Sequence, residues 1–515
     1  MEAYAYSAYY TFAGARFFTM VLKPSRTGKF PAVITRSPYV AAAADTPEET
    51  LLAQFTEKNL AFARRGYVLV FQHCRGQGKS TGEFVPYIRE REDGRALWDW
   101  VRAQDFYNGQ LFLLGGSYTA SLHYSTAPFA RDILAAVFNV QDSERYRLWY
   151  RNGCMRRGHA DWHFKLYKAK SGLHKTFTPD SFSERPLQDL SLRALGERAE
   201  DFEEMLTAPR IEAPFWQTRY GGVEARGALD AADIPILLTT GYNDFYIGGM
   251  FRMWNEMQPS TRAKCAMLVS PYNHGQSYHP EKGLAFPGGS LAERFGGDLA
   301  PRWFDAVLKG EKPFVPTGKV AYYRAFEGKW APDFYAGETG EITLSLSGGA
   351  HTLLYRPNDP PSFVPEGYFM PSPDGRADVL TLFTPPQKTD LFVRGQMRAR
   401  LAVSSDCADT SFYIRVSVRT ARGDYALRHD ITSILYQKGR YRRGEKVVLD
   451  FTFDEYAFAL KAGEVLRVDV APTDKNTYVP HTNRRGDYSR VKTCQTARNT
   501  VYANESQLIL PVEKQ

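Results

Sequence analysis

Residues 111–120 read Leu-Phe-Leu-Leu-Gly-Gly-Ser-Tyr-Thr-Ala, an apolar run followed by two glycines, a serine and mostly small residues. Apolar residues without polar alternation are typical of a strand that is buried on both faces of a parallel sheet. The glycines predict a tight turn from this strand into a helix. Such a turn holds the serine hydroxyl above the sheet edge and points the next backbone N–H at the place where an oxyanion would form. Ser117 is therefore a candidate nucleophile.

The turn departs from the G-x-S-x-G pattern of nucleophile elbows, because Thr119 stands where the second glycine is expected. A serine beside two glycines also occurs in ordinary turns, so this stretch alone leaves both interpretations open. A catalytic serine needs a base and a group that orients the base. The rest of the chain has to supply both.

The region around this turn predicts an α/β core. Apolar runs at residues 33–34, 68–71, 111–114 and 135–138 alternate with helix-compatible segments, which is typical of a parallel sheet covered by helices. Residues 145–230 are charged, aromatic-rich and helical in pattern, which predicts an inserted helical cap. Buried-type strands return later in the chain. We therefore assign residues 1–144 and 231–315 to the two parts of the core.

The last part of the chain, residues 316–515, has a different pattern. Six segments alternate polar and apolar residues, are rich in β-branched residues and are separated by turn residues. They lie at residues 341–349, 398–406, 410–420, 445–453, 464–472 and 505–512. Many short strands of this kind predict an all-β sandwich or jelly roll.

Two candidate partners of Ser117 follow buried-type strands in the second part of the core. Asp244 ends the stretch Gly-Tyr-Asn-Asp at residues 241–244, and His274 lies in Pro-Tyr-Asn-His-Gly at residues 271–275. Functional groups in open parallel sheets gather at the carboxyl ends of the strands. The order Ser, Asp, His is that of the α/β-hydrolase triad. The three residues therefore predict nucleophilic catalysis at one edge of the sheet.

The chain resembles the cocaine esterase and X-prolyl dipeptidyl-peptidase family of serine hydrolases, which includes α-amino-acid ester hydrolases. The resemblance covers nearly the whole chain. Its landmarks are R-S-P-Y at 36–39, R-G-x-G-x-S-x-G-E-F at 75–84, the segment from Asp93 to Trp100, N-G at 108–109, G-G-S-Y at 115–118, G-Y-N-D at 241–244, P-Y-N-H-G at 271–275 and W-F-D-x-x-L-K-G at 303–310.

The resemblance implies an α/β-hydrolase core with an inserted helical cap and a C-terminal all-β jelly-roll domain. It implies Ser117 as nucleophile, Asp244 as acid and His274 as base. It also implies that the Tyr39 hydroxyl and the Tyr118 backbone N–H form the oxyanion hole. His73 stands where the family usually has aspartate, and we assign it no role.

The residues after Asp244 bear on the substrate. Amino-ester hydrolases of this family carry acidic residues there to bind a substrate ammonium, whereas this chain has Phe245, Tyr246 and Ile247. We therefore expect a serine hydrolase that cleaves carboxylic esters or amides. An X-Pro dipeptidyl-peptidase acting on peptide N-termini is one alternative. A catalytically inactive binding protein that uses the jelly roll is another.

The predicted cap holds several candidate substrate-binding side chains. Trp149 and Trp162, with Phe245 of the core, are candidates for an apolar acyl pocket. An arginine cluster at the start of the cap either faces solvent or binds a substrate carboxylate. It comprises Arg145, Arg147, Arg151, Arg156 and Arg157. His159 and His163 have the spacing of a metal pair but lack the glutamate of H-E-x-x-H, so we predict no metal and no cofactor.

The bulk composition is that of a globular protein with a mixed-charge surface. The 515 residues include 65 Lys and Arg against 57 Asp and Glu, and the basic residues are dispersed. We therefore expect no nucleic-acid partner. The five cysteines form no C-x-x-C pair, and no leader pattern or long apolar run occurs, so we expect reduced thiols, a cytoplasmic location and no membrane partner. The expected partner is a small-molecule ester, amide or short peptide, and a homo-oligomer is compatible with the sequence.

Overall fold

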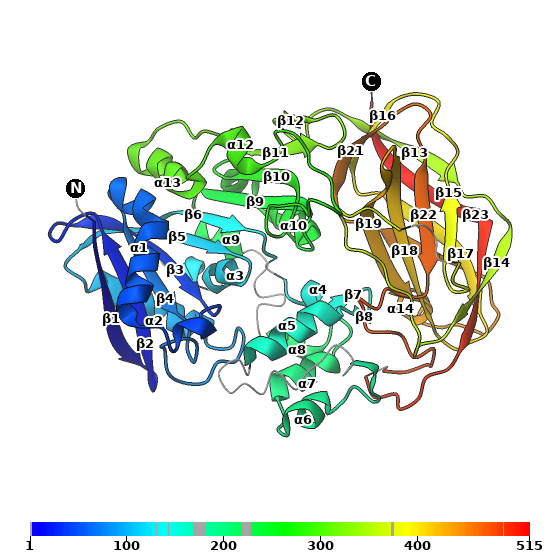
Figure 1. Cartoon of the computed structure of the whole chain (residues 1–515), viewed down its shortest axis with the longest axis horizontal. Helices are drawn as coiled ribbons and strands as arrows, with labels where there is room; N and C mark the ends of the chain where they lie inside the picture. The colour runs from blue at the N-terminus through cyan, green and yellow to red at the C-terminus, as the bar shows by residue number, and fades with distance from the viewer. Residues whose placement is uncertain are drawn as a thin grey trace.

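A computed structural model describes residues 3–124, 126–129, 131–142, 144–167, 182–218, 228–371, 375–487 and 489–514. In Figure 1 an α/β domain lies at the left, an all-β domain at the right, and a group of short helices below and between them. The α/β domain contains the N-terminus, and β23 at the end of the chain belongs to the all-β domain.

The α/β domain is built on a ten-stranded sheet with the order β1-β2-β4-β3-β5-β6-β9-β10-β11-β12. The strands are β1 (Tyr4–Phe12), β2 (Ala15–Lys23), β3 (Phe30–Ser37), β4 (Val68–His73), β5 (Tyr107–Gly116), β6 (Ile133–Asn139), β9 (Ile236–Asn243), β10 (Ala266–Asn273), β11 (Lys319–Arg324) and β12 (Lys329–Ala331). Pairing is parallel from β4 to β11 and antiparallel toward both edges. The neighbours β5, β6, β9 and β10 therefore end at the same edge of the sheet.

Helices cover both faces of this sheet, as expected for strands that lack alternation of polar and apolar residues. The helices are α1 (Glu48–Arg64), α2 (Glu90–Arg102), α3 (Tyr118–Tyr124), α10 (Ile247–Glu256), α11 (Pro259–Arg262), α12 (Leu291–Phe295) and α13 (Leu299–Lys309), with short 3-10 turns η1 (Ala41–Ala43) and η2 (Ala127–Phe129). On β5, Leu111 and Leu113 belong to the same apolar cluster as Trp98 of α2, whereas Phe112 packs against Phe304 of α13. Helix α13 ends at a left-handed Gly310, a conformation in which glycine commonly terminates helices.

The cap is a set of short elements that follow β6. They are α4 (Tyr146–Trp149), β7 (Tyr150–Arg151), β8 (Cys154–Met155), α5 (Arg157–Tyr167), α6 (Leu190–Leu195), α7 (Glu200–Leu206), α8 (Pro214–Thr218) and α9 (Ala228–Ala232). The pattern of residues 145–230 predicts helices only, but β7 and β8 pair as a short hairpin. Fully buried Trp149 and Trp216 anchor the packing of the cap.

The all-β domain consists of a seven-stranded and a four-stranded sheet, and every strand pair in it is antiparallel. The larger sheet contains β13 (Thr339–Ser345), β14 (Ala350–Tyr355), β16 (Leu391–Gly395), β17 (Arg398–Ser405), β20 (Val447–Thr452), β21 (Tyr456–Leu460) and β23 (Ala497–Glu513). The smaller sheet contains β15 (Leu380–Phe383), β18 (Ser411–Thr420), β19 (Gly423–Ser433) and β22 (Leu466–Ala471), and α14 (Ile434–Lys438) follows β19. The fold is thus an α/β-hydrolase core with a cap and a C-terminal jelly roll.

The first strands after residue 316 pair in the α/β sheet. The sequence pattern places the start of the all-β region at residue 316, but β11 and β12 extend the α/β sheet as far as Ala331. The first strand of the all-β sheets is β13. Residue alternation identifies a strand, but it does not determine which sheet the strand joins, because that depends on pairing with distant residues.

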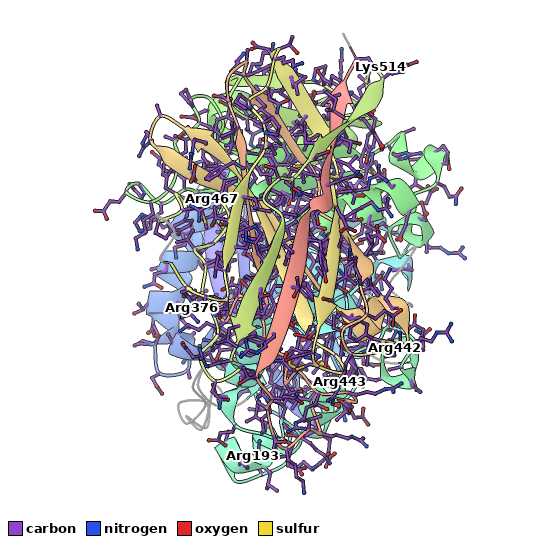
Figure 2. The ribbon with its side chains drawn as sticks, turned by 90° about the vertical axis from the view of Figure 1, so that its right-hand side faces the viewer. Arg193, Arg376, Arg442, Arg443, Arg467 and Lys514 are labelled. Carbon is purple, nitrogen blue, oxygen red and sulfur yellow. The ribbon has the colours of Figure 1, made fainter. Side chains whose placement is uncertain are left out.

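The outer face of the jelly roll carries basic residues that are mostly paired with acids. Figure 2, which views the molecule from this side, shows Lys514 at the top and Arg193 of the cap helix α6 at the bottom, below the jelly roll. Arg467 contacts Asp424 and Asp469, and Lys514 contacts Glu338. In the described part of the chain, no helix is long and apolar enough to cross a membrane.

Candidate active site

Ser117 occupies a strained turn between β5 and α3. Its φ angle is +54°, in the left-handed region that non-glycine residues seldom adopt. Its N–H donates to the Asn139 carbonyl at 2.9 Å, and its carbonyl accepts from Ala120 N–H at 2.9 Å. A Cβ on Gly115 would lie 2.4 Å from the Thr119 carbonyl oxygen, so this position requires glycine. The predicted strand, turn and helix are confirmed.

The departure at Thr119 has a structural explanation. Its hydroxyl accepts the Gly116 N–H at 2.7 Å and donates to the Gly116 carbonyl at 2.7 Å. A side-chain hydroxyl that satisfies both backbone groups of one residue ties the turn together. Threonine therefore fits this turn in place of the second glycine.

Asp244 and His274 lie just beyond the carboxyl ends of β9 and β10, where they form a contact. The His274 Nδ1 and Asp244 Oδ1 atoms are 3.0 Å apart. Asp244 is fully buried, and its carboxylate also accepts Tyr246 N–H at 3.1 Å and the Thr240 hydroxyl at 3.3 Å. These donors fix the carboxylate. The imidazole is therefore held in one orientation, with Nδ1 on the aspartate.

Phe245 and Tyr246 pack around the imidazole. The Phe245 ring stacks on His274 with centroids 4.8 Å apart, and the Tyr246 centroid lies 5.5 Å from it. The Tyr246 hydroxyl lies near enough to the Ser117 side chain to interact with it. This proximity leaves no local pattern in the sequence, in which Tyr246 is simply a non-acidic residue after Asp244.

Ser117, His274 and Tyr39 line a single cavity of about 740 Å³. The Tyr39 hydroxyl lies near enough to the Ser117 side chain to interact with it, and it accepts the Trp162 indole N–H at 3.2 Å. About half of the Tyr39 side chain is exposed, but desolvation of its hydroxyl raises the pKa to about 12. The hydroxyl therefore keeps its proton at neutral pH and can donate it toward the serine.

The Tyr118 N–H belongs to the first turn of α3, where backbone N–H groups lack intrahelical partners. The Tyr118 ring is buried, and its hydroxyl donates to Glu90 at 2.8 Å while accepting Tyr87 N–H at 2.7 Å. Glu90 in turn contacts Arg36 at 2.9 Å. Arg36 belongs to the R-S-P-Y landmark, so this buried network links the strand β3, which precedes Tyr39, to the helix after Ser117.

The three aromatic residues predicted for the acyl pocket lie in different places. Trp162 and Phe245 line the cavity. Trp149 does not line it, because its side chain is fully buried and packs against His159, His163 and Phe202. Trp149 supports the cap behind the cavity wall. Hydrophobicity alone could not separate a residue that lines a pocket from one that supports it.

Residues of the jelly roll and of its connections also form part of the cavity wall. They are Pro365, Glu366, Tyr368, His429, Asn476 and Thr477. The cap adds Leu148, Arg156, Gly158 and His159. A contact between the cavity and a domain distant in the chain leaves no local pattern in the sequence, so this part of the wall could not be predicted.

The histidine pair of the cap is packed into the core of the cap. His159 stacks on Trp162, and both His159 and His163 contact the Trp149 ring. Burial lowers the pKa of His163 to about 3. Within the described ranges no group of three or more His, Cys, Asp or Glu side chains is placed to hold a metal ion.

The chain is similar to known hydrolases over most of its length. The X-Pro dipeptidyl-peptidase (S15 family) profile matches residues 13–276, and the X-Pro dipeptidyl-peptidase C-terminal non-catalytic domain matches residues 317–508. A cocaine esterase from Rhodococcus sp. (strain MB1 Bresler) is 24% identical over 469 residues, which are 78% of this chain and 77% of that protein.

Two solved structures share the fold over nearly their whole length. An α-amino acid ester hydrolase has a TM-score of 0.80 at 18% identity, with 99% of this chain and 97% of that chain covered. An aminopeptidase from a marine sediment Thaumarchaeota archaeon has a TM-score of 0.79 at 17% identity, with the same coverage of both chains. With the family profile matched across more than half of its length, the chain belongs to the X-Pro dipeptidyl-peptidase (S15) family and is a serine hydrolase.

Proposed function

We propose that this protein hydrolyses carboxylic esters or amides through an acyl-enzyme on Ser117. The proposal rests on one observation above all: Ser117, the Tyr39 hydroxyl and the His274 that contacts Asp244 line the same cavity. Acyl transfer requires a nucleophile, a hydrogen-bond donor for the oxyanion and an oriented base around one cavity, and these three residues meet that requirement.

The acylation step uses each of these groups. His274 Nε2 accepts the Ser117 hydroxyl proton as Oγ attacks the substrate carbonyl carbon, and Asp244 stabilises the imidazolium. The Tyr39 hydroxyl and the Tyr118 N–H donate to the oxyanion of the tetrahedral intermediate. The intermediate collapses as the C–O or C–N bond breaks, and the leaving alcohol or amine takes the proton from His274.

Water completes the cycle. His274 removes a proton from a water molecule, whose oxygen attacks the acyl carbon of the ester on Ser117. Collapse of the second tetrahedral intermediate breaks the bond to Oγ, and His274 returns the proton to the serine. The carboxylic acid then leaves, and the enzyme is restored.

Two observations favour esters or simple amides over removal of X-Pro from peptide N-termini. Binding of a peptide ammonium needs an available carboxylate, and Phe245, Tyr246 and Ile247 follow Asp244 instead of acids. Among the described residues of the cavity wall the carboxylate is Glu366, and it is already bound to Arg428 at 2.6 Å and His429 at 2.9 Å. The dipeptidyl-peptidase remains the second candidate because of the family profile.

A fluorophosphonate probe tests the nucleophile directly. We expect it to label Ser117 and to leave the Ser117→Ala variant unlabelled, with hydrolysis of short-chain nitrophenyl esters lost in the same variant. Robust hydrolysis by Ser117→Ala would overturn the assignment. An inactive binding protein predicts no labelling at all.

A comparison of substrates separates the two enzymatic candidates. We expect hydrolysis of 4-nitrophenyl butyrate to exceed that of a Gly-Pro anilide when both are compared by kcat/KM. Fast cleavage of the anilide with negligible esterase activity would establish the dipeptidyl-peptidase instead.

A further inference from the structure

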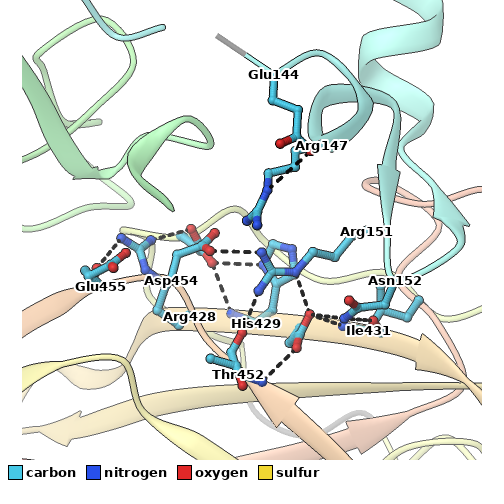
Figure 3. A network of polar contacts seen from close by, with 12 residues as sticks. Glu144, Arg147, Arg151, Asn152, Arg428, His429, Ile431, Thr452, Asp454 and Glu455 are labelled. Carbon is cyan, nitrogen blue, oxygen red and sulfur yellow. Dashed lines mark hydrogen bonds and ion pairs between the residues drawn. The ribbon is translucent and has the colours of Figure 1, made fainter. Parts of the chain in front are cut away.

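The five arginines at the start of the cap differ in what they contact. Arg147 lies 3.7 Å from Glu144. Arg151 contacts Asp430 at 2.7 Å and Asp454 at 2.9 Å, which ties the cap to the jelly roll. Figure 3 shows both arginines directed at these acidic partners. Both guanidinium groups therefore have acidic partners within the protein, and that of Arg151 also links the cap to the jelly roll.

Two more of the arginines are engaged elsewhere. The Arg145 guanidinium lies over the Tyr87 ring, and the Arg157 guanidinium donates to the Lys475 carbonyl at 2.8 Å. Neither residue is part of the described wall of the catalytic cavity. A role in substrate recognition therefore does not extend to the whole cluster.

Arg156 is different, because it lines the cavity together with Ser117. Its Nε atom is buried and has no hydrogen-bond partner among the residues that the structure describes. Its guanidinium lies 5.9 Å from the centre of the Tyr478 ring, and the described residues place no carboxylate within ion-pair distance of it. A half-buried guanidinium without an anion is costly, and a bound anion would relieve that cost.

The other ionisable groups of the cavity do not neutralise Arg156. The Glu366 carboxylate is bound by Arg428 and His429, which hold its pKa well below the usual range. Burial, together with the charges of His163, Arg145 and Arg156, keeps the pKa of His159 well below its ordinary value, so that imidazole is uncharged at neutral pH. Among the described residues of the cavity wall, Arg156 is thus a guanidinium that no acid neutralises and that a ligand bound at Ser117 could reach.

We propose that the substrate of this hydrolase carries a carboxylate that Arg156 binds, in addition to the ester or amide that Ser117 attacks. The proposal rests on the function proposed above and names its substrate class. A guanidinium matches a carboxylate with two parallel N–H···O bonds and equal and opposite charge. A phosphate dianion would call for further donors, so a singly charged carboxylate is the better match.

The test uses three esters and compares each variant with the wild type on the same ester, which cancels differences in intrinsic reactivity. The neutral ester is 4-nitrophenyl butyrate. Mono-4-nitrophenyl glutarate carries a carboxylate on the acyl side, and the butyrate ester of 3-hydroxybenzoic acid carries one on the leaving group. The variants are Arg156→Gln, Arg156→Lys and the matched control Arg157→Gln.

We expect Arg156→Gln to lower kcat/KM for one of the two carboxylate esters by about 10- to 100-fold more than for the neutral ester, as loss of a charged hydrogen bond would. Which ester responds identifies the side of the scissile bond that faces Arg156. Arg156→Lys should recover part of the loss, because it keeps the charge but not the planar fork. Arg157→Gln should not discriminate among the esters.

Equal losses on all three esters would overturn the carboxylate assignment while leaving the hydrolase assignment intact. Absence of both hydrolysis and fluorophosphonate labelling in the wild type would instead overturn the proposed function. If Arg156→Gln fails to fold, inhibition of the wild-type enzyme still tests the proposal. Monomethyl glutarate should then inhibit hydrolysis of the neutral ester at least tenfold more strongly than dimethyl glutarate, and equal inhibition would overturn the proposal.

Discussion

The His274 imidazole donates its Nδ1 proton to the Asp244 carboxylate across 3.0 Å, and the Asp244 side chain has no exposed surface. The two residues come from loops after neighbouring parallel strands, whose register brings the carboxyl ends of β9 and β10 together. Because the aspartate is also held by Thr240 and by the Tyr246 N–H, it fixes the ring, and the proposed mechanism then uses Nε2 as the base toward the serine.

Asp244→Asn should lower kcat for ester hydrolysis by about 10⁴-fold with little change in thermal stability. An amide of the same size can present N–H to Nδ1 and stabilise the wrong tautomer of His274. Steady-state kinetics on 4-nitrophenyl butyrate measures the loss. A drop of less than tenfold would argue against Asp244 as the orienting acid.

Tyr39→Phe should lower kcat by about 100-fold while KM changes little, because an oxyanion-hole donor contributes about 3 kcal/mol in the transition state alone. The variant should still react slowly with a fluorophosphonate at Ser117. A rise in KM with unchanged kcat would indicate a substrate-binding role instead.

The pH dependence of the activity lost in Tyr39→Phe follows from the raised pKa of Tyr39, about 12. A phenol that titrates near 12 keeps its proton up to about pH 11, so the wild-type advantage over Tyr39→Phe should stay constant between pH 8 and 10.5. An ordinary tyrosine pKa of about 10 would make the advantage fall severalfold by pH 10.5. The ratio of kcat/KM for the wild type to kcat/KM for Tyr39→Phe, measured across this pH range, distinguishes the raised pKa from the ordinary one.

Thr119→Val should weaken the nucleophile turn, since both hydrogen bonds of the hydroxyl to the Gly116 backbone disappear without loss of volume. We expect destabilisation of about 1–3 kcal/mol and a lower rate of fluorophosphonate labelling. Thr119→Ser keeps the hydroxyl and serves as the matched control. Wild-type stability and labelling in Thr119→Val would contradict this account of the turn.

Arg36→Met should destabilise the protein by about 3–5 kcal/mol, because it leaves the buried Glu90 carboxylate without its ion-pair partner. The double variant Arg36→Met with Glu90→Gln should recover much of that loss, since the amide oxygen can still accept the Tyr118 hydroxyl. Chemical denaturation measures both. Additive losses in the double variant would show that the pair does not interact.

Acid should destabilise the fold through buried histidines. Burial lowers the pKa of His123 and of His163 to about 3, whereas both titrate near 6.5 in the unfolded chain. The unfolded state therefore binds more protons below pH 6.5. The stabilising contribution of each histidine is complete above that pH and declines by about 1.4 kcal/mol per unit as the pH falls toward 3.

The melting temperature measured between pH 7 and pH 4.5 tests this expectation. His163→Phe, which keeps an aromatic ring beside Trp149, should show a shallower decline than the wild type. His279→Gln removes a partly exposed histidine and should leave the slope unchanged. Identical slopes of melting temperature against pH for the wild type and both variants would contradict a role of His163 in acid destabilisation.

The sequence by itself determined the local geometry of the catalytic core. The apolar run before Gly115 and the strand signals before Asp244 and His274 predict elements whose ends meet, because parallel strands place their carboxyl ends at one edge. The contact between Asp244 and His274 follows from that arrangement. A resemblance to known motifs added Tyr39, which follows a separate strand and lines the same cavity as Ser117.

Only the tertiary structure decided what surrounds the serine. Trp149 and Trp162 look alike as cap aromatics, yet one is buried behind the wall and the other lines the cavity. Of five neighbouring arginines, Arg156 lines the cavity of Ser117 with no acidic partner among the described residues, whereas Arg151 is neutralised by aspartates 279 and 303 residues further along the chain. Residue type and spacing set local conformation, but burial and ion pairing depend on which distant segments pack together.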